Sequence, residues 1–235
     1  MNPTASQRRL VADVLAIGAP YPLLLAGEYA AGAHGLPARI GRELDVVTDN
    51  PQPMAVIAAT VRTELELRGR RVTAPEATPL SARLIVTDPF DEPGLGTGPG
   101  TGSAGGYTLQ ILKETLWQPP VQTEHGLVLS LEDVAGTRVR ALAGFGLARD
   151  LIAVRAVSDR WSLIELEELG RRHSRDTFDL TDLQARLTGI DWIAPGEFAA
   201  YGVGGDEGIG ALGRWAQEWA DDIAERLMET ETPED

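Results

Sequence analysis

The sequence contains no cysteine and only three histidines among its 235 residues. Without thiols, disulfide bonds, thiol nucleophiles and thiolate metal sites are excluded. Basic residues are also scarce: the chain has 21 lysines and arginines but 35 acidic residues, so its net charge is −14. Nucleic acids and anionic membranes repel such a chain wherever its basic residues are not clustered, so a nucleic-acid partner is disfavoured.

Long hydrophobic runs are missing as well. No apolar stretch approaches the length that a bilayer requires, and the first residues, MNPTASQRRLVADVL, contain no extended apolar segment ahead of a cleavage site. We therefore expect a cytoplasmic protein with no membrane partner. Its apolar content of 43% suffices for the core of one large domain or two smaller ones.

Hydrophobic periodicity divides the chain into a mixed half and a helical half. The first half alternates helical patterns, at 4–17 and 51–69, with short strand patterns. The strand patterns lie at 23–25, 43–48, 71–74, 82–87 and 107–112. After Pro119 and Pro120, apolar residues recur at three- and four-residue spacing to the end. The pattern predicts an α+β protein, with a sheet and helices in residues 1–120 and a helical bundle in residues 121–235.

Two acids, Glu43 and Asp45, flank Leu44 in the predicted strand 43–48. Because successive side chains of a strand alternate between faces, both carboxylates project from one face and Leu44 from the other. Two acids on one face can hold a divalent cation, and they can equally be a solvated strand end. Gly27 precedes them at a predicted strand-to-helix turn.

The segment 88–106 is rich in glycine, without a helical or strand period. A phosphate-binding loop of the form G-x-x-x-x-G-K-[ST] is absent from it. A flexible hairpin tip is the interpretation that its composition favours.

The stretch LLLAGEYAAGAHGL…RELDVVT resembles the opening of the AbiEii/AbiGii-type nucleotidyltransferases, a toxin branch of the DNA polymerase beta-like superfamily. The resemblance, closest to actinobacterial members, continues through PLSARLIVTDP, LQILKETLWQPPV and VLSLEDVAGTRVRALAGFGLARDLIAV, and covers nearly the whole chain. It implies a nucleotidyltransferase fold with a small mixed sheet. It also implies a small-residue turn, a D-x-D pair, a third carboxylate that helps hold two magnesium ions, and a lysine on a following helix.

Several of these implied positions hold other residues in this chain. The second residue of the turn is Glu28, the first acid of the pair is Glu43, and only Asp45 matches unchanged. Gln110 stands where the resemblance implies the third carboxylate, and Arg138 where it implies the lysine. The substitutions predict a degenerate site, because a neutral amide is a poor ligand for a hard cation and Glu28 places a negative charge near phosphates.

We therefore expect a protein whose nucleotide transfer is lost and whose site is reused for a small-molecule substrate. The predicted catalytic residues are Glu28, Glu43, Asp45 and Arg138, and the chemistry is metal-independent acid/base catalysis such as a biosynthetic cyclisation or rearrangement. Arg138 either binds an anion or pairs with Glu28 or Glu43. The predicted substrate-binding residues are Tyr29, Arg42, Tyr107 and Gln110.

No cofactor or metal is expected under this hypothesis, with Glu43 and Asp45 as the ligands of any metal that does bind. The first alternative is an active toxin that uses magnesium and a nucleoside triphosphate to modify tRNA or protein, and that has a cognate antitoxin. The second alternative is a binding partner without catalytic activity.

Overall fold

The computed structural model describes residues 3–88, 106–174 and 178–231. The chain divides into two compact units. The first unit comprises Met1–Ala33 and Ile40–Ser130, and the second comprises His34–Arg39 and Leu131–Asp235. Almost all of the glycine-rich segment predicted to be a hairpin tip lies outside the described residues.

The first unit is a sheet with three helices. In chain order its elements are α1 (Ala5–Gly18), β1 (Leu24–Leu25), α2 (Gly27–Ala33), β2 (Glu43–Thr48), α3 (Met54–Leu67), β3 (Arg71–Ala77), β4 (Ser81–Thr87), β5 (Tyr107–Lys113), β6 (Val121–Thr123) and β7 (Gly126–Val128). The strands form a sheet in the order β3-β4-β5-β2-β1-β7-β6. It is mixed, because β2 pairs in parallel with β5 while β4 pairs antiparallel with β5. The prediction of an α+β fold with a mixed sheet is confirmed.

Side chains alternate between the two faces of the central strands. Leu44 and Val46 of β2, and Leu109 and Ile111 of β5, are almost fully buried. Of the intervening positions, Glu43 is exposed, Asp45, Thr108 and Gln110 are half-buried, and Val47 is buried. The face that carries Glu43, Asp45 and Gln110 is called the polar face below.

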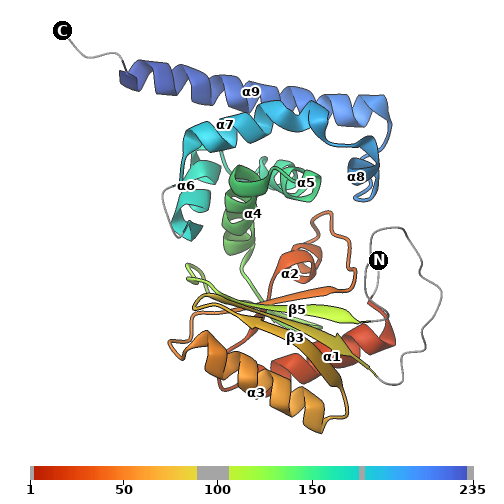
Figure 1. The fold of residues 1–235 in the computed structure, drawn as a ribbon. Coiled ribbons are helices and arrows are strands. Elements are labelled where there is room, and N and C mark those ends of the chain that lie inside the picture. The colour runs from red at the N-terminus through yellow and green to blue at the C-terminus, as the bar shows by residue number, and fades with distance from the viewer. Residues whose placement is uncertain (1–2, 89–105, 175–177, 232–235) are drawn as a thin grey trace. The chain divides into compact units, whose positions relative to one another are not determined.

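Helices lie on both faces of this sheet, with α1 and α3 on one side and α2 on the other (Figure 1). Helix α1 begins at a capping box, in which the Thr4 hydroxyl accepts from the Gln7 backbone N–H and the Gln7 side chain bonds back to Thr4. Leu10, Val14, Ile57 and Val61 of α1 and α3 are all buried. Their burial shows that the two helices contribute to the core of this unit.

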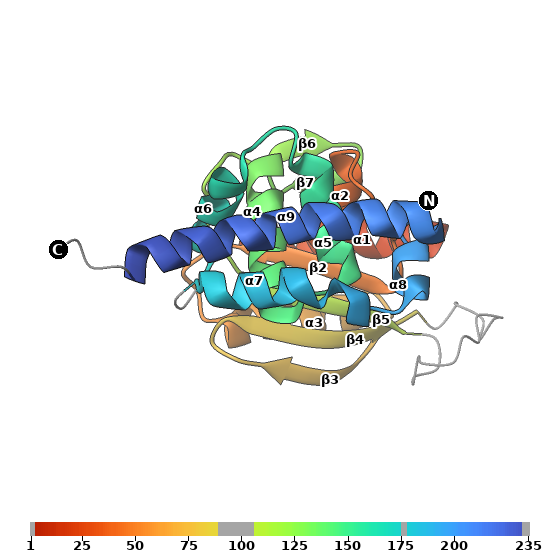
Figure 2. The same cartoon turned by 90° about the horizontal axis from the view of Figure 1, so that it is seen from above.

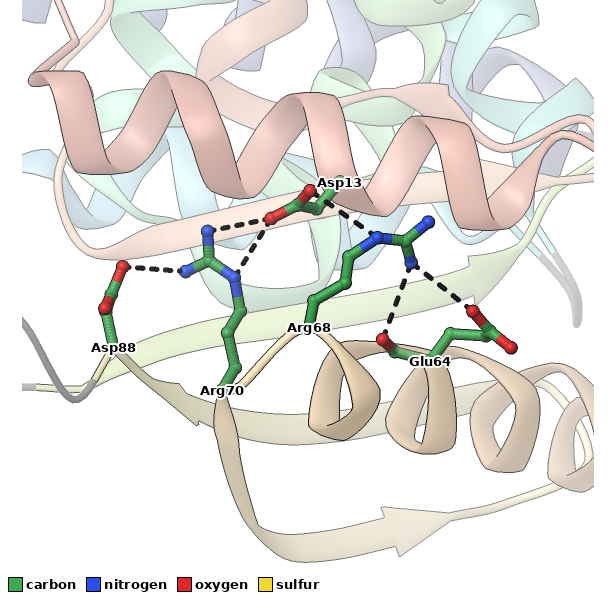
Figure 3. A network of polar contacts seen from close by, with 5 residues as sticks. All are labelled: Asp13, Glu64, Arg68, Arg70 and Asp88. Carbon is green, nitrogen blue, oxygen red and sulfur yellow. Dashed lines mark hydrogen bonds and ion pairs between the residues drawn. The ribbon is translucent and has the colours of Figure 1, made fainter.

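A network of charged residues joins α1 to the end of α3 and to the residues that precede β3 and follow β4 (Figure 3). Arg70 donates through Nε and Nη2 to Asp13 Oδ2, at 3.1 and 2.9 Å, and its Nη1 lies 3.5 Å from Asp88 Oδ2. Arg68 lies 3.8 Å from the other Asp13 oxygen. The Arg70 side chain is 6% exposed, so its charge depends on these carboxylates for solvation.

The second unit is helical. Its elements are α4 (Leu131–Phe145), α5 (Ala148–Val157), α6 (Leu163–His173), α7 (Leu180–Thr188), the 3-10 helix η1 (Gly189–Trp192), α8 (Pro195–Ala199) and α9 (Gly205–Glu231). Helix α9 runs beside α7 (Figure 2). The apolar stripe of α9 is in the core, because Leu212, Trp219 and Ile223 are buried. Ser162 and Glu165 form a capping box at the start of α6.

Strands β6 and β7 belong to the first unit, although the sequence predicted the helical half to start at residue 121. They add to the sheet because Val128 of β7 pairs with Leu25 of β1. Each has only three residues, which is too short for a two-residue period to show. Within the described residues, no helix combines the length and the apolar character that a transmembrane segment needs.

Candidate functional site

The turn from β1 to α2 fits directly against Asp45. Gly27, the first residue of α2, has a φ of +55°, a left-handed conformation that favours glycine. A Cβ at this position would lie 2.1 Å from Asp45 Oδ2. The adjacent Ala26 N–H donates to the Asp45 backbone carbonyl at 2.9 Å. Only glycine leaves room for the Asp45 carboxylate where the turn meets β2.

This contact predicts a specific cost for Gly27→Ala. The variant combines backbone strain with a clash, so we expect the free energy of unfolding to fall by more than the roughly 1–2 kcal/mol of the left-handed backbone alone. Gly69→Ala is the matched control, because Gly69 has a φ of +82° and a Cβ added there would meet nothing within 4 Å. Urea denaturation of both variants tests this prediction, and equal losses would contradict the close approach of Asp45.

Gln110 stands directly beside Asp45. The two residues are register partners in the parallel pair of β2 and β5, and Glu43 is the partner of Thr108 two residues earlier. Register partners on neighbouring strands project from the same face. The structure therefore brings Glu43, Asp45 and Gln110 together on the polar face. The prediction that both acids share one face, opposite Leu44, is confirmed by the alternating burial of β2.

Arg42 and Tyr107 lie together but apart from this group. The Arg42 guanidinium carbon is 5.7 Å from the centre of the Tyr107 ring, a cation–π contact. Tyr107 is buried like Leu109 and Ile111, so strand alternation directs it to the apolar face. These two predicted substrate-binding residues and Gln110 thus project from opposite faces of the sheet.

Tyr29, in α2, is a buried phenol whose ring meets that of His125 edge-on at 6.5 Å. Burial, with a smaller contribution from Tyr107, raises the pKa of Tyr29 to about 12. Tyr29 is therefore neutral at physiological pH. It can serve as a hydrogen-bond donor or acceptor but not as a ready base.

Glu28 and Arg138 are both buried, and they belong to the first and the second unit respectively. Glu28 lies in the first turn of α2 and is 9% exposed. Arg138, on α4, donates from Nη1 to Asp150 Oδ1 at 2.7 Å. Asp150 on α5 is 1% exposed, and it is a partner for Arg138 that the sequence reasoning did not assign. The sequence feature that could have pointed to Asp150 is the Arg149-Asp150 dipeptide within LARDLIAV. Pairing of Arg138 with Glu28 or Glu43 stays a prediction.

Arg83 is a second residue of interest that periodicity alone did not identify. It lies on β4 as the register partner of Gln110, in the antiparallel pair of β4 and β5. Asp45, Gln110 and Arg83 thus form a row across three adjacent strands of the polar face. The signal in the sequence is the alternation of SARLIVT, in which Ala82, Leu84 and Val86 are buried and Arg83 is exposed.

The donor set on the polar face does not fit a pair of magnesium ions. Glu43 and Asp45 contribute carboxylates, whereas Gln110 contributes only an amide. Across the part of the chain that the structure describes, no group of three or more His, Asp or Glu side chains is placed to hold a metal ion. A two-metal site for phosphoryl chemistry needs carboxylates that bridge and flank both ions, and a lone acidic pair supplies too few.

Solved structures of other proteins share this architecture. The Helicobacter pylori protein JHP933 is 18% identical over 96% of this chain and 95% of its own, with a TM-score of 0.50. A second Helicobacter pylori protein is 14% identical over 99% of this chain and 100% of its own, with a TM-score of 0.53. Its name assigns it provisionally to the nucleotidyltransferases. MenT4, a nucleotidyltransferase toxin of Mycobacterium tuberculosis H37Rv, is 14% identical over 92% of this chain and 82% of its own, with a TM-score of 0.51.

The comparisons with these structures show that the chain has a nucleotidyltransferase fold. At such low identity they establish the fold alone. No family model matches the sequence, and no curated protein matches it either.

Proposed function

We propose that this protein has a nucleotidyltransferase fold but no longer transfers nucleotides, and that it binds a small molecule on the polar face of the sheet. The observation that carries the proposal is the neutral Gln110 beside Asp45, at the position where the resemblance implies a third carboxylate. Without that acid, the second metal loses a ligand and the phosphates of a nucleotide lose part of their counter-charge.

The same side chains are suited to acid/base chemistry. Asp45 is held against the β1–α2 turn by its contact with Gly27, so its carboxylate has a defined position. Glu43 is more exposed and stands two residues away on the same face. A positioned carboxylate can accept a proton from a bound substrate and return it elsewhere, as a cyclisation or rearrangement requires. In this proposal Asp45 is the base, Glu43 assists it, and Gln110 orients the substrate.

A second candidate function is an active, magnesium-dependent nucleotidyltransferase toxin. It is favoured by the shared fold with MenT4 and by Asp45 beside Gly27, with Glu43 on the same face of β2. Under this function Glu43 and Asp45 would hold one magnesium ion, and a nucleoside monophosphate would pass to tRNA or protein. The charge of −14 disfavours a tRNA acceptor. An antitoxin protein would be the expected partner.

Calorimetric titration with magnesium and each nucleoside triphosphate distinguishes the two functions. We expect no metal-dependent binding by the native protein. Metal-dependent binding that disappears in Asp45→Asn would overturn the loss of nucleotide transfer and support the toxin.

A gain-of-function variant tests the reason for that loss. If Gln110 and Glu28 are responsible, the double variant Glu28→Gly and Gln110→Asp is expected to bind a nucleoside triphosphate with magnesium. Glu28→Gly combined with Gln122→Asp is the matched control, because it makes the same two charge changes but places the new carboxylate on the exposed strand β6. Binding by the control as well would show that the added charge acts nonspecifically.

A further inference from the structure

The connection between α2 and β2 belongs to the helical unit. After Ala33 the chain leaves the first unit, and it returns at Ile40. The six residues in between, 34–39, cluster with the second unit and are called the connecting segment below. Leu36, in the middle of the connecting segment, packs against the hydrophobic core of the helices. The second unit is therefore built from two separate stretches of chain, and the shorter one lies between two elements of the candidate site.

The two ends of α2 are held differently. At its start, Gly27 fits against Asp45 of β2, and Tyr29 in the first turn is buried. At its end, Gly32 and Ala33 are both exposed. The last turn of α2 thus buries little surface of its own, and it continues directly into the connecting segment.

Helix α2 depends on such support at its end. It has only seven residues, and a helix of that length is not stable in water without tertiary contacts. Gly32 weakens the last turn further, because glycine is a poor helix former. When the second unit opens, Leu36 loses its packing and the connecting segment becomes a flexible link between Ala33 and Ile40. The last turn of α2 then loses the support that follows it.

We infer that the helical unit holds the C-terminal turn of α2 through Leu36, so that the stability of the second unit determines the stability of the part of the candidate site that α2 carries. The link is the chain itself. A molecule that binds and stabilises the second unit therefore stabilises α2 as well, and the reverse also holds, because coupling between two sites is reciprocal. The inference is independent of the proposed function, since it concerns the position of α2 whatever the site binds.

Hydrogen exchange of the full chain, followed residue by residue by NMR, tests the role of Leu36. In Leu36→Ala we expect the amides of Gly32 and Ala33 to exchange about tenfold faster than in the native protein, and the amides of β4 to keep their native rates. Leu36→Met retains most of the packing, so its rates should be close to native. Leu67→Ala, the same truncation at a position of α3 that is 75% exposed, is the matched control and should change neither set of amides.

A second variant tests whether the whole helical unit is involved. Trp219→Ala weakens the core of that unit, where Trp219 is fully buried. Exchange is measured in urea below the unfolding transition, so that opening of the unit outweighs local fraying. We expect Trp219→Ala to accelerate exchange in the last turn of α2 about tenfold, and to add less than about twofold when Leu36→Ala is already present.

Three outcomes would overturn the inference. They are native exchange rates in the last turn of α2 in Leu36→Ala, acceleration by Trp219→Ala that is confined to residues 131–231, and equal acceleration of α2 and β4 by Trp219→Ala. Circular dichroism confirms that each variant is folded. If Leu36→Ala does not fold, Leu36→Val provides the same test with a smaller truncation, and Trp219→Ala in the native background decides separately.

Discussion

Arg70→Met is expected to lower the free energy of unfolding of the first unit by about 3 kcal/mol, as removal of one partner from a buried ion pair does. Methionine keeps much of the side-chain volume but removes the donors that reach Asp13 and Asp88 (Figure 3). The Asp88 side chain is only 9% exposed, so water cannot fully replace the lost cation. Urea denaturation followed by circular dichroism measures the change, and hydrogen exchange in α1 and β3 assigns it to this unit.

Arg68→Met provides the matched control for this prediction. Arg68 also approaches Asp13, at 3.8 Å, but its side chain is 38% exposed. Exposed ion pairs contribute little, so the expected loss is below about 1 kcal/mol. Equal losses in the two variants would show that burial of Arg70 does not determine its contribution.

Trp219→Ala is expected to destabilise the second unit by about 4 kcal/mol, because it empties a large volume in the centre of a packed core. Trp219 is 0% exposed, and its ring lies 5.5 Å from that of Trp215. Its Nε1 donates to Glu167 Oε1 at 2.9 Å, so the variant also removes a partner of a buried carboxylate. Arg226 remains to compensate Glu167 through bonds of 2.6 and 2.9 Å.

Two further variants separate the parts of this effect. Trp219→Phe keeps an aromatic ring but not the N–H donor, and the expected loss is about 1–2 kcal/mol. Trp192→Ala changes the same residue type at a position that is 92% exposed, and should alter stability by less than about 0.5 kcal/mol. Denaturation followed by tryptophan fluorescence measures all three, and a large loss in Trp192→Ala would contradict the described core.

Local features of the candidate site followed from the sequence. The alternation of Glu43, Leu44 and Asp45 places both acids on one face, and the structure has them there. The helical patterns at 4–17 and in the last part of the chain also followed from the sequence, because a helical period depends on residues within a few positions of one another. The resemblance, not the periodicity, pointed to Gln110 as the residue that replaces a carboxylate.

Strand alternation also separates two of the predicted substrate-binding residues. Tyr107 and Gln110 were grouped as substrate-binding residues, yet they are three positions apart on one strand. An odd separation puts two strand residues on opposite faces, and burial of Tyr107 with Leu109 agrees with this. The separation of Arg42 and Tyr107 from the acids was therefore within reach of the sequence.

The sequence by itself determined the kinds of elements, their buried faces and the face that carries Glu43 and Asp45, because backbone periodicity is a local property. Only the tertiary structure decided that β5 lies between β2 and β4, so that Gln110 and Arg83 line up with Asp45, and that Arg138 meets Asp150. Strand order and helix contacts depend on which distant apolar faces pack together, and no short stretch of sequence encodes that choice.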